Sequence, residues 1–187
     1  MSIVAAVIKD NQIAIAADTQ SLFGDVKVPM DNFKTNKVRK VGNSYLAITG
    51  WGVYDNILND YINPKRPPNL ANPKLIYAFF QKLWRALQEN YAFVNQQSEE
   101  KNSPFVDLAA SFLVVNKNGI FSVAPDMSVS RFEKYYAVGS GWHFALGAVH
   151  ALYPQKLSAA ELAKKAVETT IAFRPDCGGE VQVIRVK

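Results

Sequence analysis

Two apolar runs at the start of the sequence constrain the fold most strongly, because together they predict a β-hairpin that begins at residue 2. Ile3 to Ile8 and Ile13 to Ala17 flank a short polar segment, Asp10-Asn11-Gln12, and apolar runs on either side of a polar turn are typical of paired strands. The polar segment also interrupts the apolar stretch too early for a secretory signal peptide, and no basic leader precedes it. We therefore expect the hairpin to belong to the folded protein.

Further along the chain, strand pairs alternate with helix pairs. Strands are predicted at 37–41, 44–49, 107–115, 119–124, 127–132, 134–138 and 180–186, and helices at 53–62, 73–93, 141–152 and 158–172. The clearest local signals are the Gly42-Asn43 turn, Pro73 at a helix start, and a capping box from Ser158 to Glu161. This order favours an α+β fold with two sheets between two helical layers over a parallel doubly wound sheet. We expect residues 1–187 to form one such domain.

Composition limits the location and the partners of the protein. Cys177 is the single cysteine, so no internal disulfide can form, and no run of about 18 consecutive apolar residues predicts a membrane-spanning helix. Both observations predict a cytoplasmic protein without a membrane partner. The net charge of +5 comes from lysines and arginines spread along the chain, which favours an ordinary solvated surface over binding to nucleic acid.

Few residues fit the common catalytic motifs. The sequence contains no nucleophile elbow, no Walker loop and no paired-cysteine zinc motif. His143 and His150 lie on one predicted helix without the i, i+4 spacing and third partner of metal ligands, so surface or packing roles are favoured. Cys177 together with one of them could make a thiol hydrolase, but a small semi-buried side chain is the favoured interpretation. No metal and no cofactor is predicted.

The N-terminus offers a different chemistry. Ser is small enough that Met1 is normally removed before it, so we expect the mature chain to start at Ser2 with a free α-amine. An α-amine titrates near ~7.7–8.0 and can act as a base at neutral pH. Ser2 would then supply both the nucleophile and the base. Many proteins begin with Met-Ser, so this hypothesis depends on residues elsewhere in the chain.

Four segments, in order and at similar spacing, resemble the mature β-subunits of proteasomes and the peptidase ring of the bacterial ATP-dependent protease. The first runs from Ser2 to Gln20 and places Asp18 at the family's spacing from the nucleophile; the others are KVRKV at 37–41, AITG at 47–50 and YAVGSG at 136–141. Small bacterial proteasome homologues, including the Anbu and β-proteobacterial types, look most similar. The resemblance implies the four-layer αββα sandwich of N-terminal-nucleophile hydrolases. It also implies a ring-shaped or helical homo-oligomer whose active sites face an interior space.

The resemblance also implies roles for individual residues. Lys37 would lower the pKa of the N-terminal amine through like-charge repulsion and polarise the hydroxyl, and Asp18 would pair with Lys37. The N–H of Gly50 would stabilise the oxyanion, which contributes ~3–4 kcal/mol in comparable sites. Ser140 would form a hydrogen bond near the nucleophile, and Ile48 would line an apolar specificity pocket.

Two departures from the family pattern concern the site directly. The nucleophile is Ser2 where the family usually has threonine, so the methyl group that helps to fix the rotamer is missing. The family also has an aspartate three residues before a serine-glycine pair, and both side chains brace the amine. Aligned on Gly178-Gly179, Cys177 replaces the serine and Arg174 replaces the aspartate, and Asp176 substitutes only if the loop shifts. Arg174 would depress the pKa of the amine but could not accept its hydrogen bond.

The function predicted from the resemblance is a peptidase that uses Ser2 and acts on unfolded peptides inside a homo-oligomeric chamber. Two alternatives stay open at this point. The first is a catalytically inactive assembly protein that kept the proteasome-like fold, and the second is an amidase of the same nucleophile class that acts on small molecules. Whether an ATPase partner feeds the assembly is also left open.

Overall fold

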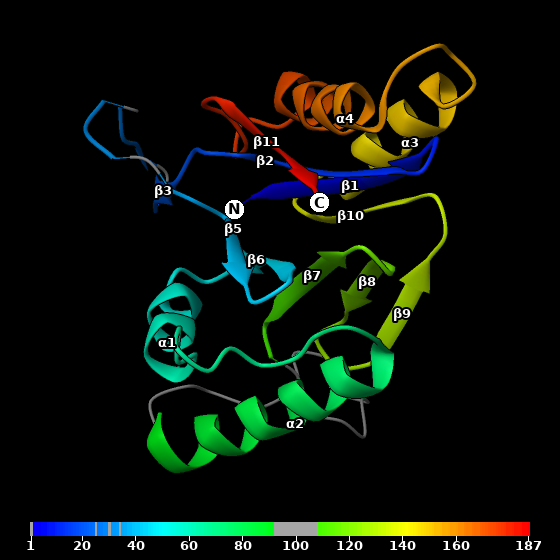
Figure 1. Cartoon of the computed structure of the whole chain (residues 1–187). Helices are drawn as coiled ribbons and strands as arrows, with labels where there is room; N and C mark the ends of the chain where they lie inside the picture. Colours follow the sequence, from blue (N-terminus) through cyan, green and yellow to red (C-terminus); the bar gives the residue numbers. More distant parts are fainter. Residues whose placement is uncertain (1, 25, 30, 34, 92–107) are drawn as a thin grey trace.

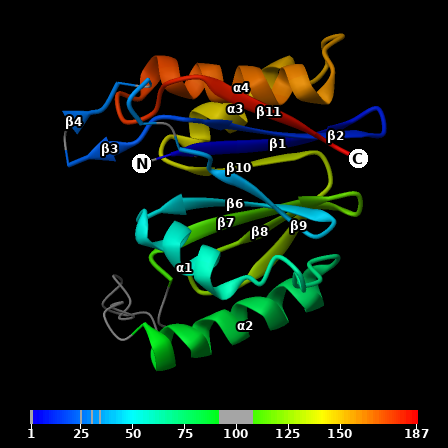
Figure 2. The ribbon, with the colours of Figure 1, turned by 60° about the vertical axis from the view of Figure 1, so that its left-hand side comes forward.

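The computed structural model describes residues 2–24, 26–29, 31–33, 35–91 and 108–187 (Figure 1). Over these residues the chain forms four layers, in which two antiparallel sheets are stacked face to face and a pair of helices covers each outer face (Figures 1 and 2). The αββα sandwich predicted from the order of elements is therefore confirmed. None of the helices described is both long enough and apolar enough to cross a bilayer.

The first sheet contains the two termini of the fold and has the strand order β10-β1-β2-β11. Its strands are β1 (Ile3–Lys9), β2 (Gln12–Asp18), β10 (Tyr135–Gly139) and β11 (Val181–Val186). The predicted opening hairpin is confirmed, with Val4 paired to Ala17 across it. Asp10 and Asn11 at its turn have φ values of 50° and 58°, the left-handed conformation that tight two-residue hairpins require.

The second sheet has the strand order β5-β6-β7-β8-β9. Its strands are β5 (Val38–Val41), β6 (Ser44–Gly50), β7 (Ala110–Asn116), β8 (Gly119–Val123) and β9 (Val129–Phe132). A small hairpin of β3 (Leu22–Phe23) and β4 (Val26–Lys27) projects from the side of the sandwich (Figure 2). Each strand of the second sheet is antiparallel to its neighbours, so chain reversals bring strand starts and strand ends to the same edge.

The four helices that form the outer layers match the predicted ones closely. They are α1 (Val53–Tyr61), α2 (Pro73–Asn90), α3 (Trp142–Leu152) and α4 (Ala159–Phe173). The prediction that α2 extends to residue 93 is wrong at Tyr91, where φ is −129° and ψ is 56°, outside the helical region. Its last two predicted residues lie outside the described part of the chain, as do the polar segment 95–104 and the first residue of the strand predicted at 107–115.

Three apolar layers hold the sandwich together. Phe80 and Phe112 belong to the layer between the α1–α2 pair and the second sheet, and Val4 and Leu113 to the layer between the sheets. The layer under α3 and α4 is rich in alanine, for example Ala163, and small side chains let these helices lie close to the sheet. Because both sheets are buried against each other, the residues at their shared edge are held in a fixed arrangement.

Candidate active site

The residues predicted for the site lie at strand ends on one edge of the two sheets. Ser2 precedes β1, Asp18 is the last residue of β2, and Lys37 directly precedes β5. Gly50 ends β6 and Ser140 follows β10. In an antiparallel sheet the start of one strand lies beside the end of its neighbour, so side chains far apart in sequence meet at this edge.

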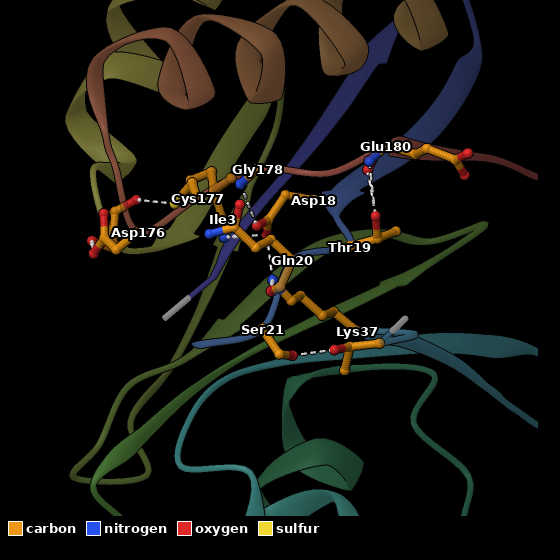
Figure 3. Close-up of polar contacts among 12 residues, drawn as sticks. Ile3, Asp18, Thr19, Gln20, Ser21, Lys37, Asp176, Cys177, Gly178 and Glu180 are labelled. Atoms are coloured by element: carbon orange, nitrogen blue, oxygen red, sulfur yellow. Dashed lines mark hydrogen bonds and ion pairs between the residues drawn. The ribbon is translucent and has the colours of Figure 1, made fainter. Parts of the chain in front are cut away.

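Asp18 is the centre of the polar network at this edge (Figure 3). Its side chain is completely buried, and Oδ1 accepts hydrogen bonds from the Lys37 ammonium at 2.7 Å and from the Ile3 N–H at 2.9 Å. Oδ2 accepts from the Gly178 N–H at 3.1 Å. The Asp18 carboxylate therefore binds Lys37, Ile3 and the C-terminal loop at once. These three donors compensate a charge that is buried away from water.

Lys37 is buried and held on two sides. Its ammonium also donates to the backbone carbonyl of Gln20 at 2.6 Å, and its side chain is 5% exposed. Burial lowers the pKa of Lys37 below its usual range, while the carboxylate of Asp18 and, more weakly, that of Asp55 raise it. A lysine with a depressed pKa can exchange its proton more readily at neutral pH than a solvated one.

The backbone of Ser2 is held by the turn after β10. The Ser140 N–H donates to the Ser2 carbonyl at 2.7 Å. Gly139 has a φ of 105°, and a Cβ atom placed there would lie 2.1 Å from the Ser2 carbonyl oxygen, so only glycine allows this approach. The glycine before Ser140 therefore decides where the predicted nucleophile sits.

Asp176 and Arg174 form a polar cluster with Ser140. The Ser140 hydroxyl donates to Asp176 at 2.6 Å, and Arg174 donates to Asp176 through two nitrogens at 2.8 Å each and to the Ser140 oxygen at 2.9 Å. The Arg174 hydrogen bond holds the pKa of Asp176 at about 2. The C-terminal loop thus brings the Asp176 carboxylate to Ser140, and Arg174 neutralises its charge.

Cys177 is buried outside this polar network, and both histidines lie exposed on α3. Cys177 is 2% exposed with its thiol 3.7 Å from the Ser140 carbonyl, and burial raises the pKa of this thiol to about 12, opposite to what a thiolate nucleophile needs. His150 shares a hydrogen bond of 2.9 Å with the Tyr135 hydroxyl, and His143 packs between aromatic neighbours on α3. Within the described ranges, no three His, Cys, Asp or Glu side chains are placed to hold a metal ion.

A cavity of about 380 Å³ opens in front of these residues. Ser2, Lys37, Ile48 and Gly50 all line it, so the predicted nucleophile, lysine, oxyanion donor and specificity residue share one space. Gly50 is exposed and has a φ of 139°, a conformation that L side chains rarely adopt. Their catalytic roles stay predictions, but the structure brings them together.

Two site residues carry no signal in the sequence because they act through the backbone. Gln20 accepts from Lys37 with its carbonyl oxygen, and Gly178 donates to Asp18 with its N–H. Gln20 also donates its N–H to the Gly178 carbonyl at 3.0 Å, and a Cβ atom on Gly178 would lie 2.1 Å from the Gln20 amide oxygen. Gln20 and Gly178 therefore pack directly against each other, and each is bonded to one member of the Lys37–Asp18 pair.

Solved structures provide comparisons for the whole chain. The structure of BPH, a bacterial proteasome homologue, from Thiobacillus denitrificans is 35% identical with a TM-score of 0.86, and the match covers 98% of this chain and 96% of that one. The same protein in complex with epoxomicin gives the same identity and TM-score over 97% of its length. HslV from Trypanosoma brucei shares the fold, at 18% identity and a TM-score of 0.66 over 98% of both chains. No protein-family model and no curated protein matches the chain.

Proposed function

This chain belongs to the family of bacterial proteasome homologues, within the N-terminal-nucleophile hydrolases, and from that membership we propose that it is a peptidase whose nucleophile is the Ser2 hydroxyl. The observation that carries the proposal is the buried Lys37–Asp18 pair at 2.7 Å, next to a cavity shared by Ser2 and Gly50. A buried ion pair costs desolvation energy and is weak evidence of stability by itself. Its place beside a nucleophile in a cavity favours a chemical role.

The first half of the reaction requires that Met1 be removed. The freed α-amine takes the proton of the Ser2 hydroxyl, directly or through one water, while Oγ attacks the carbonyl carbon of the scissile bond. The positive Lys37 disfavours a second positive charge on the amine and so keeps it available as a base. The N–H of Gly50 stabilises the oxyanion. The C–N bond then breaks, the leaving amine takes a proton from the α-ammonium of Ser2, and the acyl group remains on Ser2 as an ester.

The second half reverses these roles. Water enters the cavity, gives its proton to the α-amine and attacks the ester carbonyl, and the Ser2 oxygen leaves as the hydroxyl is reprotonated. Asp18 keeps Lys37 in place through both halves, and the Asp176–Arg174–Ser140 cluster holds the turn that supports Ser2. In this proposal Ser140 and Asp176 brace the amine, and Arg174 balances the charge of the carboxylate.

The proposal extends to assembly and location. We expect a homo-oligomer, as a ring or helical stack, in which the Ser2 sites face an interior space that admits unfolded peptides. The single cysteine, Cys177, is consistent with the reducing cytoplasm as the place of function.

The test is covalent labelling of Ser2. Intact mass first establishes that Met1 is absent, and a peptide vinyl sulfone, which reacts with hydroxyl nucleophiles, is then expected to add once per chain at Ser2. Epoxomicin, found in complex with the Thiobacillus relative, is expected to protect Ser2 from the label. Ser2→Ala serves as the unreactive control.

The two alternatives give different outcomes in the same experiment. An unlabelled Ser2 in a chain without Met1, in an intact oligomer, would identify an inactive assembly protein. Labelling without turnover of any peptide, but with hydrolysis of small amides, would identify an amidase. The hydrogen bond from Ser140 to Asp176 at 2.6 Å supports an active site over an inactive one, because it keeps a carboxylate beside the turn that holds Ser2.

A further inference from the structure

The cavity in front of Ser2 is mostly apolar and carries aromatic side chains at its opening. Its lining includes Leu22, Phe23, Phe33, Ile48 and Trp51. Three of these are unusually exposed for aromatic residues, with Phe23 at 56%, Phe33 at 43% and Trp51 at 71%. Exposed aromatic side chains gathered at a cavity are typical of sites that bind an apolar partner.

Three of the polar side chains of the cavity are bonded to one another or to a buried neighbour. The Ser21 hydroxyl shares a hydrogen bond with the Thr35 hydroxyl, and the Lys37 ammonium is bonded to Asp18. The remaining charged group on the described lining is Asp55 near the start of α1. Its carboxylate raises the pKa of Lys37 electrostatically, so it acts across the same space as the site.

Asp55 is neutralised by Arg39, which reaches it from β5. One guanidinium nitrogen of Arg39 pairs with the Asp55 carboxylate and also lies 3.5 Å from the Asp55 carbonyl, and the other donates to Asn59 at 2.8 Å. Arg39 itself lines a separate hollow with Asn59. The arginine therefore cancels the charge of the cavity wall without occupying the cavity.

We propose that Arg39 determines the selectivity of this cavity by neutralising Asp55, so that the cavity prefers an uncharged side chain, aromatic or large aliphatic, on the substrate residue whose carbonyl Ser2 attacks. The inference rests on the proposed function for the position of the scissile carbonyl. With that carbonyl between Ser2 and the Gly50 N–H, the side chain on the same residue enters the space that both residues line. A charged side chain there would be desolvated without a partner.

Trp51 and the Phe23–Phe33 pair define the rest of the contact. The two phenylalanine rings meet edge to face at 5.3 Å, and Trp51 directly follows the predicted oxyanion donor, Gly50. Because these exposed rings line the cavity, we expect them to contact the substrate and to contribute binding that does not depend on the charge of Asp55. Truncation of Trp51 is therefore expected to weaken all peptides, whereas changes at Arg39 alter selectivity.

The test measures binding separately from catalysis. Isothermal titration in the Ser2→Ala background compares capped peptide aldehydes or amides that differ only in the residue before the scissile position, Phe, Arg or Glu. The Phe peptide is expected to bind at least about tenfold more tightly than either charged peptide. Adding Arg39→Gln exposes the Asp55 carboxylate, so the Arg peptide is expected to gain about tenfold. Adding Asp55→Asn as well removes that gain.

Asp55→Asn alone provides a second variant that does not depend on the stability of Arg39→Gln. It leaves the Arg39 guanidinium uncompensated, so preference is expected to shift toward the Glu peptide. Equal binding of Phe and Arg peptides with Arg39 present, or an unchanged ratio in both variants, would overturn the inference. The selectivity can fail while Ser2 is still labelled, and Ser2 can stay unlabelled while the selectivity holds, so the two proposals are tested independently.

Discussion

Replacing Lys37 by Met separates the chemical role of the Lys37–Asp18 pair from its role in stability. Met has nearly the same length, but it cannot donate to Asp18 or carry charge. The substitution leaves the Asp18 carboxylate completely buried with two backbone donors, the N–H groups of Ile3 and Gly178. The variant is expected to be both less stable and unreactive.

The magnitude follows from the burial of the pair. Removing one partner of a buried ion pair costs ~3–5 kcal/mol, because an uncompensated charge remains. The two remaining donors to Asp18 place this case at the lower end, near ~3 kcal/mol. For a chain of 187 residues, that loss lowers Tm by roughly 6–12 °C. The double variant Lys37→Met/Asp18→Asn removes both charges and is expected to recover most of the loss, to within ~1–2 kcal/mol of the wild type.

The assay combines denaturant unfolding with labelling of Ser2, at one protein concentration because assembly makes the midpoint concentration-dependent. Stability is expected to recover in the double variant, but labelling is expected to stay at least ~10²-fold slower than in the wild type in both variants. A double variant as unstable as Lys37→Met would refute the buried-charge reasoning. Wild-type labelling of either variant would refute the role assigned to Lys37.

Four further changes give independent expectations. Gly139→Ala is expected to cost roughly 3 kcal/mol or more and to abolish labelling, because its Cβ meets a carbonyl oxygen at 2.1 Å. Gly147→Ala, in an exposed turn of α3 where a Cβ meets nothing within 4 Å, should instead raise the unfolding free energy by ~0.5–1 kcal/mol. The Arg174 hydrogen bond lowers the pKa of Asp176 from 3.8 to about 2. The ionised carboxylate therefore stabilises the fold above pH 4, and this stabilisation is lost between about pH 4 and pH 2. In Asp176→Asn, acid unfolding followed by circular dichroism should show no loss of stability from this group over that pH range. Because burial raises the pKa of Cys177 to about 12, iodoacetamide at pH 8 should leave the mass of the folded protein unchanged and alkylate it only after unfolding.

The order of elements could be predicted because its signals are local. Ser158 and Glu161 make both hydrogen bonds of the predicted capping box at the start of α4, and Gly42-Asn43 lies in the turn between β5 and β6. Each signal involves residues within a few positions of one another, so backbone preference alone determines the outcome. At the end of α2 the apolar pattern continues past Asn90, but the hydroxyl of Tyr91 contacts Asp60 and the chain leaves the helix.

The details of the site depend on contacts that no local pattern records. The resemblance to proteasome subunits predicts Asp18, Lys37 and Gly50 by type and spacing; Lys37 pairs with Asp18, and Gly50 lines the same cavity as Lys37. The role of Asp176 is ambiguous in the sequence, because an alignment on Gly178-Gly179 takes no account of the path of the loop. In the structure the Cys177 N–H donates to the Arg174 carbonyl at 3.2 Å, and the loop turns there. That turn lets the Asp176 carboxylate reach Ser140.

The hydrogen bond between the Gly178 N–H and Asp18 joins residues 160 positions apart, and this has a consequence for synthesis. Ser2, Asp18 and Lys37 are synthesised long before Gly178 leaves the ribosome. Until then the Asp18 carboxylate lacks the hydrogen bond from the Gly178 N–H. The last strand, β11, must also dock beside β2 before the loop is held. Contacts between distant parts of a chain form late in folding. The polar network around Asp18 is therefore complete only after the C-terminal loop has been made and β11 has docked beside β2.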